Sequence, residues 1–189
     1  MRKKPKLSFR KKLFVSITAG ILFSLSNPLY AGIGVILFNF FAVLDCVDGN
    51  IARVTGKAGP WGSWADAVMG FIGYTSVFFA TGMYSYQVTQ WWPVLIIAGL
   101  TSSFNLLTRV TYQIYKNIVG ESAHNSVSFE RKLVMNAGIT GFLMPLLLIF
   151  HFCSYLPGIW GILWFNAAFY GLGCLFTIIK IAIKAAKSA

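Results

Sequence analysis

The feature that most constrains the fold is a series of apolar segments long enough to cross a lipid bilayer. A membrane-spanning helix needs about 20 mostly apolar residues, and 57% of this 189-residue chain is hydrophobic whereas only 11% is charged. This composition is too apolar for an ordinary soluble domain. We therefore predict an all-α integral membrane protein, with a basic juxtamembrane segment (residues 1–12) followed by a single membrane domain (residues 13–189). Its six predicted transmembrane helices are residues 13–27, 30–54, 62–87, 91–116, 131–152 and 157–184.

The positive charges predict how these helices are oriented. The chain has 16 Lys and Arg residues, and none of them lies in the turns predicted at one side of the membrane, which are residues 26–28, 87–92 and 154–157. Because Lys and Arg are enriched in cytoplasmic segments, both termini are expected in the cytoplasm. So plain a pattern in a small chain favours a bacterial inner membrane. It argues against a nucleic-acid partner, and the apolar segment after Ala31 argues against a cleaved signal peptide.

Three of the five acidic residues lie in one short stretch between two apolar segments. Asp45 and Asp48 lie near the end of the second predicted helix, and Asp66 lies one turn into the third. A carboxylate in the middle of a membrane costs about 2.5 to 3.5 kcal/mol on insertion scales. The three carboxylates therefore predict a functional site with positive partners, at the cytoplasmic side.

The residues around these carboxylates favour a site for a metal and a phosphate. At 100° per residue, Asp45 and Asp48 share one face of a helix with Gly49, Ala52 and Arg53. Two carboxylates one turn apart suit a hard divalent cation that also holds substrate phosphates, and the aspartate of the third helix can complete the site. The small residues leave room for a bulky ligand, and the arginine suits a phosphate group.

Two other readings of the same stretch remain open. An interhelical ion pair with Arg53 or Lys57 would account for one acid, but not for all three. A proton, ion or solute pathway also places carboxylates in a membrane. The cysteines and histidines give no comparable signal, because none of them clusters at metal-ligand spacing; they are Cys46, Cys153, Cys174, His124 and His151.

Residues 45–70 resemble the signature of the CDP-alcohol phosphotransferase (CDP-alcohol phosphatidyltransferase) family, which is D-x2-D-G-x2-A-R-x8-G-x3-D-x3-D. Seven of its eight positions match at the family's spacing, namely Asp45, Asp48, Gly49, Ala52, Arg53, Gly62 and Asp66. The resemblance implies a transferase that moves a substituted phosphate group from a CDP-alcohol to an acceptor hydroxyl and releases CMP, as in phospholipid or glycan biosynthesis. At least one substrate is expected to be a lipid, and the family is commonly homodimeric.

The resemblance also implies roles for individual residues. The implied ligands of Mg²⁺ or Mn²⁺ are Asp45, Asp48 and Asp66. The residues that would contact or make room for the CDP moiety are Gly49, Ala52, Arg53 and Gly62. The nearest candidates for a basic acceptor-binding pocket are Arg109, Arg131 and Lys132, which are equally well explained as the positive flanks of membrane helices.

The eighth position of the signature, an aspartate that is a metal ligand and the proposed general base, is Gly70 in this chain. Glycine has no side chain that could bind a metal or accept a proton. An aspartate restored at this position would be expected to bind a second metal. Glycine here either packs helices closely, in a stripe with Ala67 and Gly73, or opens space in the pocket. The weak candidates for a replacement base are Glu130, Glu121 and His124, and an acceptor could bring its own carboxylate or phosphate.

Three hypotheses therefore follow from the sequence. The first is an active CDP-alcohol transferase with altered base chemistry. The second is a non-catalytic relative that binds a metal or a CDP-alcohol, and the third is an ion or solute pathway. The motif leaves the identity of donor and acceptor open.

Overall fold

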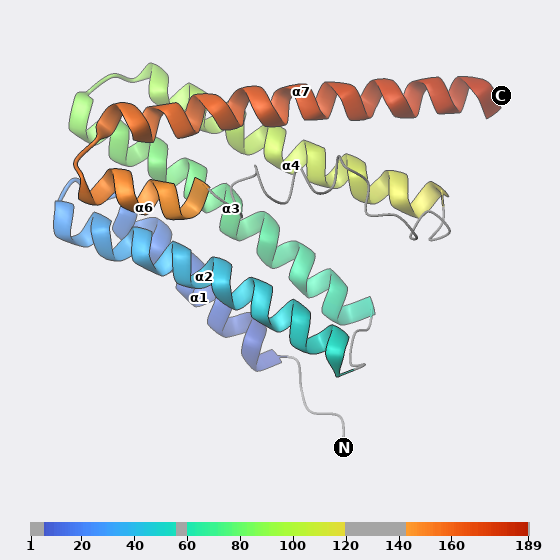
Figure 1. Ribbon diagram of the computed structural model, residues 1–189, viewed down its shortest axis with the longest axis horizontal. Coiled ribbons are helices and arrows are strands. Elements are labelled where there is room, and N and C mark those ends of the chain that lie inside the picture. The colour runs from blue at the N-terminus through green and yellow to red at the C-terminus, as the bar shows by residue number, and fades with distance from the viewer. Residues whose placement is uncertain (1–5, 56–59, 120–142, 189) are drawn as a thin grey trace.

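The computed structural model describes residues 6–55, 60–119 and 143–188, and all regular elements in this part of the chain are helices (Figure 1). The prediction of an all-α protein is confirmed for these residues. The helices are α1 (Lys6–Phe23), α2 (Pro28–Val54), α3 (Pro60–Thr89), α4 (Pro93–Val119), α6 (Met144–Phe152) and α7 (Leu156–Ser188).

Proline marks the first residue of three helices, at Pro28, Pro60 and Pro93. Proline suits this position because its ring fixes a helical φ and the missing N–H would have no partner within the helix. In the turn before α2, the Asn27 side-chain oxygen accepts a hydrogen bond from the Leu29 backbone N–H at 2.9 Å. The Asn-Pro turn predicted between the first two helices is thus a capped helix start.

Within the described residues, four helices contain segments that are long and apolar enough to cross a membrane, which supports the prediction of a membrane protein. These segments are Pro28–Val47, Ala67–Thr89, Pro93–Thr111 and Leu156–Ile183. They agree with four of the six predicted spans. The first half of α1 carries Lys and Arg residues, and α6 is only nine residues long, so neither qualifies by length and composition. Six spans remain a proposal.

The helices form a bundle with two distinct ends (Figure 1). The α1–α2, α3–α4 and α6–α7 links gather at one end, whereas the start of α1, the end of α2 and the start of α3 lie toward the other. The three links contain no Lys or Arg. Helix α1 packs on α2 and α3, and α4 packs on α3 and α7. This packing brings the start of α1, the end of α2 and the start of α3 together at the end opposite the links, which we call the basic end.

Glycines allow the closest helix contacts. A Cβ on Gly34 of α2 would overlap the Phe23 backbone nitrogen of α1 and lie 2.8 Å from the Ala19 carbonyl oxygen. A Cβ on Gly73 of α3 would similarly overlap the Phe41 ring of α2. Small residues let membrane helices approach to backbone contact. Gly73, a member of the predicted small-residue stripe, thus lies directly against the Phe41 ring.

Replacing Gly34 with alanine should separate α1 from α2, because the added methyl group meets backbone atoms that cannot rotate away. We expect the free energy of unfolding to fall by about 1 to 3 kcal/mol, the usual cost of overpacking. Thermal unfolding in detergent micelles measures this. The matched control is Gly99→Ala in α4, where an added Cβ meets nothing within 4 Å; equal unfolding temperatures for the two variants would contradict the proposed contact.

Candidate functional site

Three helices bring charged and polar side chains together at the basic end of the bundle. The Lys12 ammonium of α1 lies 3.2 Å from one carboxylate oxygen of Asp45 in α2. The Tyr74 hydroxyl of α3 donates a 3.4 Å hydrogen bond to the other oxygen. Lys12 is only 5% exposed and Tyr74 only 3%. Each carboxylate oxygen of Asp45, the first aspartate of the motif, therefore has a hydrogen-bond partner.

A fourth helix extends this cluster through Arg109 of α4. The guanidinium carbon of Arg109 lies 4.6 Å from the centre of the Tyr74 ring, in cation–π geometry. The Arg109 Nε–H also donates a 3.2 Å hydrogen bond to the side-chain oxygen of Asn105, one turn earlier on α4. We call Lys12, Asp45, Tyr74, Arg109 and Asn105 the Asp45 network. Each of α1, α2, α3 and α4 supplies at least one member.

The Asp45 network lies at one boundary of the apolar segments. Asp45 is two residues before the end of the span in α2, and Arg109 is two residues before the end of the span in α4. Asp66 immediately precedes the first residue of the span in α3. The backbone thus places all three residues near the same edge of the hydrophobic layer, where a site can reach both lipid and water.

The ion partner of Asp45 differs from the partners considered from the sequence. An ion pair of one acid with Arg53 or Lys57 was an alternative reading of the sequence, and residues 1–12 were predicted as a basic juxtamembrane segment. Lys12 is instead buried within α1 and bonded to Asp45. A buried carboxylate needs such a partner, because a bare charge in an apolar environment is costly.

Gly70 of α3 faces the Asp45 network. A Cβ built at this position would lie 3.5 Å from Nη1 of Arg109 and 3.7 Å from the Tyr74 ring, which are ordinary van der Waals distances. Helix packing therefore does not require glycine here, in contrast to Gly73. A side chain of one methyl group would fit here in contact with the Arg109 guanidinium and the Tyr74 ring.

The other predicted site residues are only partly described. Gly62 lies in the first turn of α3, and a Cβ there would meet nothing within 4 Å, which is consistent with room for a ligand. The helical positions of the remaining motif residues are known, but their side chains lie outside the described part: Asp48, Ala52, Arg53 and Asp66. The candidate bases and two of the acceptor-binding candidates lie entirely outside the described residues: Glu121, His124, Glu130, Arg131 and Lys132.

A divalent cation fits the chemistry of Asp45. Carboxylate oxygens are the ligands that Mg²⁺ and Mn²⁺ prefer. Each oxygen of a carboxylate has two lone pairs, so contacts with Lys12 and Tyr74 leave a lone pair on each oxygen for a metal. Among the side chains that the structure describes, no group of three His, Cys, Asp or Glu residues lies together. The cysteines are free thiols.

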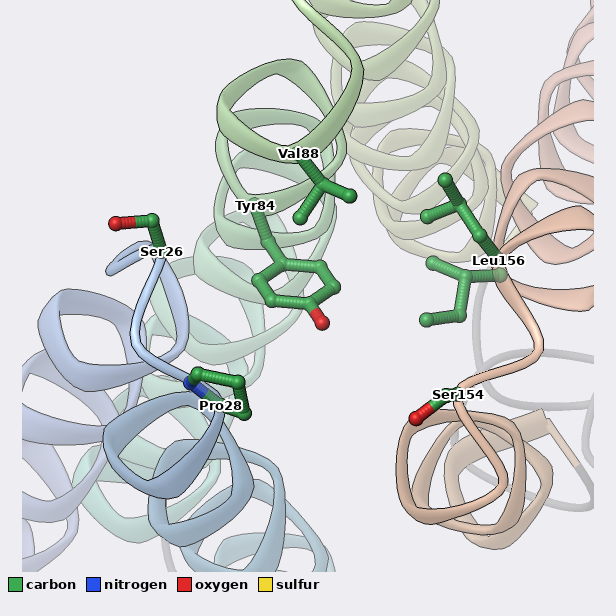
Figure 2. Close-up of a pocket in the computed structure, with 7 residues that line it drawn as sticks. Ser26, Pro28, Tyr84, Val88, Ser154 and Leu156 are labelled. Atoms are coloured by element: carbon green, nitrogen blue, oxygen red, sulfur yellow. The ribbon is translucent and has the colours of Figure 1, made fainter.

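A cavity lies at the opposite end of the bundle. It has a volume of about 350 Å³ and opens between the α1–α2 link, the end of α3 and the α6–α7 link (Figure 2). Its lining contains hydroxyl and apolar side chains without an acid, lysine or arginine: Ser26, Pro28, Tyr84, Val88, Ser154, Leu156 and Ile159. Because it offers no charged group for a phosphate or a metal, it is not the candidate site.

Helical spacing could have found some of the missed residues. Tyr74 follows Gly70 at four residues, as Gly70 follows Asp66, so all three lie on one face of a helix. Asn105 and Arg109 are spaced in the same way. Lys12 gave a weaker signal, as the last basic residue before an apolar run. No spacing rule pairs it with Asp45, because the contact depends on how α1 packs against α2.

Comparison with known proteins agrees with the family resemblance of the motif. The model of the CDP-alcohol phosphatidyltransferase family matches residues 7–179, from the start of α1 to near the end of α7. No curated protein and no solved structure shows significant similarity to this chain. The family match covers most of the chain and includes all four helices of the Asp45 network. The chain therefore belongs to the CDP-alcohol phosphatidyltransferase family.

Proposed function

We propose that this protein is an active transferase that moves a substituted phosphate group from a CDP-alcohol to an acceptor hydroxyl. The acceptor oxygen forms a new bond to the phosphorus of the transferred group, and the bond from that phosphorus to CMP breaks. The observation that carries the proposal is the half-buried Asp45 carboxylate of the family's signature, held at 3.2 Å by the buried Lys12. The products are a phosphodiester and CMP.

In this proposal, the three motif aspartates hold the metal and the diphosphate is bound beside them. The residues that would bind Mg²⁺ or Mn²⁺ are Asp45, Asp48 and Asp66. When bound, the cation supplies Lewis-acid stabilisation of negative charge on phosphoryl oxygens. Arg53 would bind the diphosphate through its planar fork of donors, and Gly49, Ala52 and Gly62 would make room for the cytidine nucleotide.

Arg109 is the proposed contact for the acceptor. Its guanidinium is held by the Tyr74 ring and by Asn105, and Arg109 is only partly buried. A positioned and partly exposed guanidinium suits a phosphate or a carboxylate. We therefore infer an acceptor that carries a negative charge. The proton of its hydroxyl would pass to this anionic group or to one of Glu121, His124 and Glu130.

The membrane arrangement is part of the same proposal. Six spans with both termini in the cytoplasm would place the Asp45 network at the cytoplasmic side, because the turns at the other end lack Lys and Arg. The ring centroids of Trp91 and Trp160 lie 5.4 Å apart at that other end, and tryptophan is enriched at membrane interfaces. A homodimer in a bacterial inner membrane, with phospholipid or glycan biosynthesis as its role, completes the proposal.

Release of CMP tests this function. Purified protein in lipid nanodiscs with Mn²⁺ or Mg²⁺ should release CMP from a CDP-alcohol such as CDP-diacylglycerol, and faster when a hydroxyl acceptor carrying phosphate or carboxylate is present. The Asp66→Asn variant should release little CMP and bind Mn²⁺ at least about tenfold more weakly, because losing even an outer-shell partner of a metal costs about 10- to 100-fold. Absence of CMP with every donor and acceptor would overturn the enzyme proposal.

A second candidate function is favoured by Gly70. A family member without the usual base is a candidate for a non-catalytic protein that binds a metal or a CDP-alcohol. Loss of a general base typically lowers a rate by about 10² to 10⁴, which leaves room for catalysis by positioning and electrostatics. Binding of Mn²⁺ and CDP-alcohol without any CMP release would identify this second function. An ion or solute pathway would show neither binding nor release.

A further inference from the structure

We propose that Asn105 is a positioning residue that orients Arg109, so that the two terminal nitrogens of the arginine together bind one anionic group of the acceptor. The inference rests on the proposed function, in which Arg109 contacts the acceptor. It adds which part of the guanidinium receives the anion and which residue sets this orientation.

Two contacts hold the Arg109 guanidinium and leave its terminal nitrogens available. Its Nε–H donates a 3.2 Å hydrogen bond to the side-chain oxygen of Asn105, and its carbon atom lies 4.6 Å from the centre of the Tyr74 ring. Within the part of the chain that the structure describes, Nη1 and Nη2 make no hydrogen bond. Because these two nitrogens carry most of the N–H donors of an arginine, the guanidinium keeps most of its capacity to bind an anion.

The hydrogen bond at Nε decides which pair of donors can hold the anion. A carboxylate or a phosphate binds most strongly to two parallel N–H groups of one guanidinium. Since Asn105 occupies the Nε–H, the pair that remains is Nη1 and Nη2. Arg109 is partly exposed whereas Asn105 is 0% exposed, so we expect the anion at the terminal end of the arginine, away from the asparagine.

Stability alone does not account for an asparagine at position 105. The side chain is fully buried, and its Nδ2 amide group has no hydrogen-bond partner among the described residues. A buried donor without a partner destabilises a folded protein, whereas an apolar side chain of similar shape carries no such cost. Leucine should therefore be at least as stable here. The asparagine is explained by the one bond that its side chain makes in the described part, which is the bond to Nε of Arg109.

The test measures how inorganic phosphate protects Arg109 from phenylglyoxal, a reagent that modifies the terminal nitrogens of arginine. Mass spectrometry follows the modification of the full chain in nanodiscs of zwitterionic lipid. Phosphate should slow the modification of Arg109 in the wild-type protein. Asn105→Leu should need about 3- to 10-fold more phosphate for half-protection, because an arginine that is not held in place must be ordered when the anion binds. The unfolding temperature of this variant should equal or exceed that of the wild type.

Asn166→Leu is the matched control. Asn166 of α7 is also 0% exposed, and its Oδ1 atom likewise has no partner among the described residues. Its Nδ2 group donates to the backbone oxygen of Ile162 in the same helix rather than to an arginine. Phosphate should therefore protect Arg109 in Asn166→Leu as it does in the wild type.

A second measurement does not depend on the folding of an Asn105 variant. In the NMR spectrum of ¹⁵N-arginine-labelled protein, the Nε–H signal of Arg109 is identified by its loss in Arg109→Gln. Because this N–H is bonded to a fully buried asparagine, it should exchange slowly with water and remain bonded when phosphate is added. Rapid exchange in the wild type would overturn the positioning role of Asn105.

The outcomes separate this inference from the proposed transferase. Equal phosphate protection in Asn105→Leu and Asn166→Leu would overturn the positioning role, as would an unfolding temperature that falls in Asn105→Leu but not in Asn166→Leu. A wild-type Arg109 that phosphate does not protect would overturn the anion site as a whole. None of these measurements uses CMP release, so the failure of this inference and the failure of the enzyme proposal are observed in different experiments.

Discussion

Replacing Asp45 with leucine is expected to lower the free energy of unfolding by about 3 to 5 kcal/mol and to abolish CMP release. The stability loss follows because the variant leaves the Lys12 ammonium buried without its carboxylate, and breaking a buried ion pair from one side costs about this much. The activity loss follows because a proposed metal ligand is removed. Equilibrium unfolding in mixed micelles and the CMP assay measure the two effects separately.

Adding Lys12→Met to Asp45→Leu should restore most of the stability but none of the activity. Replacement of a whole buried ion pair by apolar residues is often neutral or stabilising by about 1 to 4 kcal/mol, because neither charge must then be taken out of water. The matched control is Asp45→Leu with Lys11→Met, in which the removed charge was exposed and no rescue is expected. Equal stability of Asp45→Leu and the wild type would contradict the buried pair.

The second large effect concerns Gly70. A carboxylate introduced by Gly70→Asp would reach the Arg109 guanidinium, because Nη1 lies only 3.5 Å from the position of the new Cβ. The new pair should occupy Arg109 and raise the KM for an anionic acceptor about 10- to 100-fold, as expected for losing a hydrogen bond to a charged group worth about 1.5 to 3 kcal/mol. Steady-state kinetics with varied acceptor concentration measures this change.

Three variants make the Gly70 prediction specific. Gly70→Ala fits without overlap and should leave the KM within about twofold, and Gly70→Asn should have a small effect because it matches aspartate in shape but not in charge. In an Arg109→Gln background, Gly70→Asp should add little, since interacting residues give non-additive effects in a double-mutant cycle. Faster turnover in Gly70→Asp with an unchanged KM would show instead that the position still serves as the family's base.

The sequence and the structure lead to different expectations for an aspartate introduced at residue 70. From the motif, restoring an aspartate was expected to add a metal ligand, because the family has one there. In the folded protein the nearest group to that position is a cation, and a carboxylate beside Arg109 would pair with it. Considered alone, Gly70 means that the family's carboxylate is missing; together with Arg109 it is consistent with the proposed anionic acceptor.

The structure also shows that two glycines of the small-residue stripe, Gly70 and Gly73, have different surroundings. The spacing of the stripe left two roles open for Gly70, which were close packing in a stripe with Gly73 and space in the pocket. The structure distinguishes the two glycines, because an added Cβ would overlap the Phe41 ring at Gly73 but would lie at van der Waals distance from Arg109 at Gly70. Spacing along one helix gives the face on which a residue lies, but it does not identify what lies opposite.

The sequence by itself determined the helical class, the membrane setting and the residues of the motif. Apolar length, the distribution of Lys and Arg, and the spacing of Asp45, Asp48 and Asp66 are local properties, and each follows from helix geometry or from the cost of charge in lipid. Only the tertiary structure decided which side chains from other helices lie around Asp45. Lys12, Tyr74 and Arg109 lie on three other helices, and contacts between distant segments depend on how those helices pack, which no periodicity within a single helix encodes.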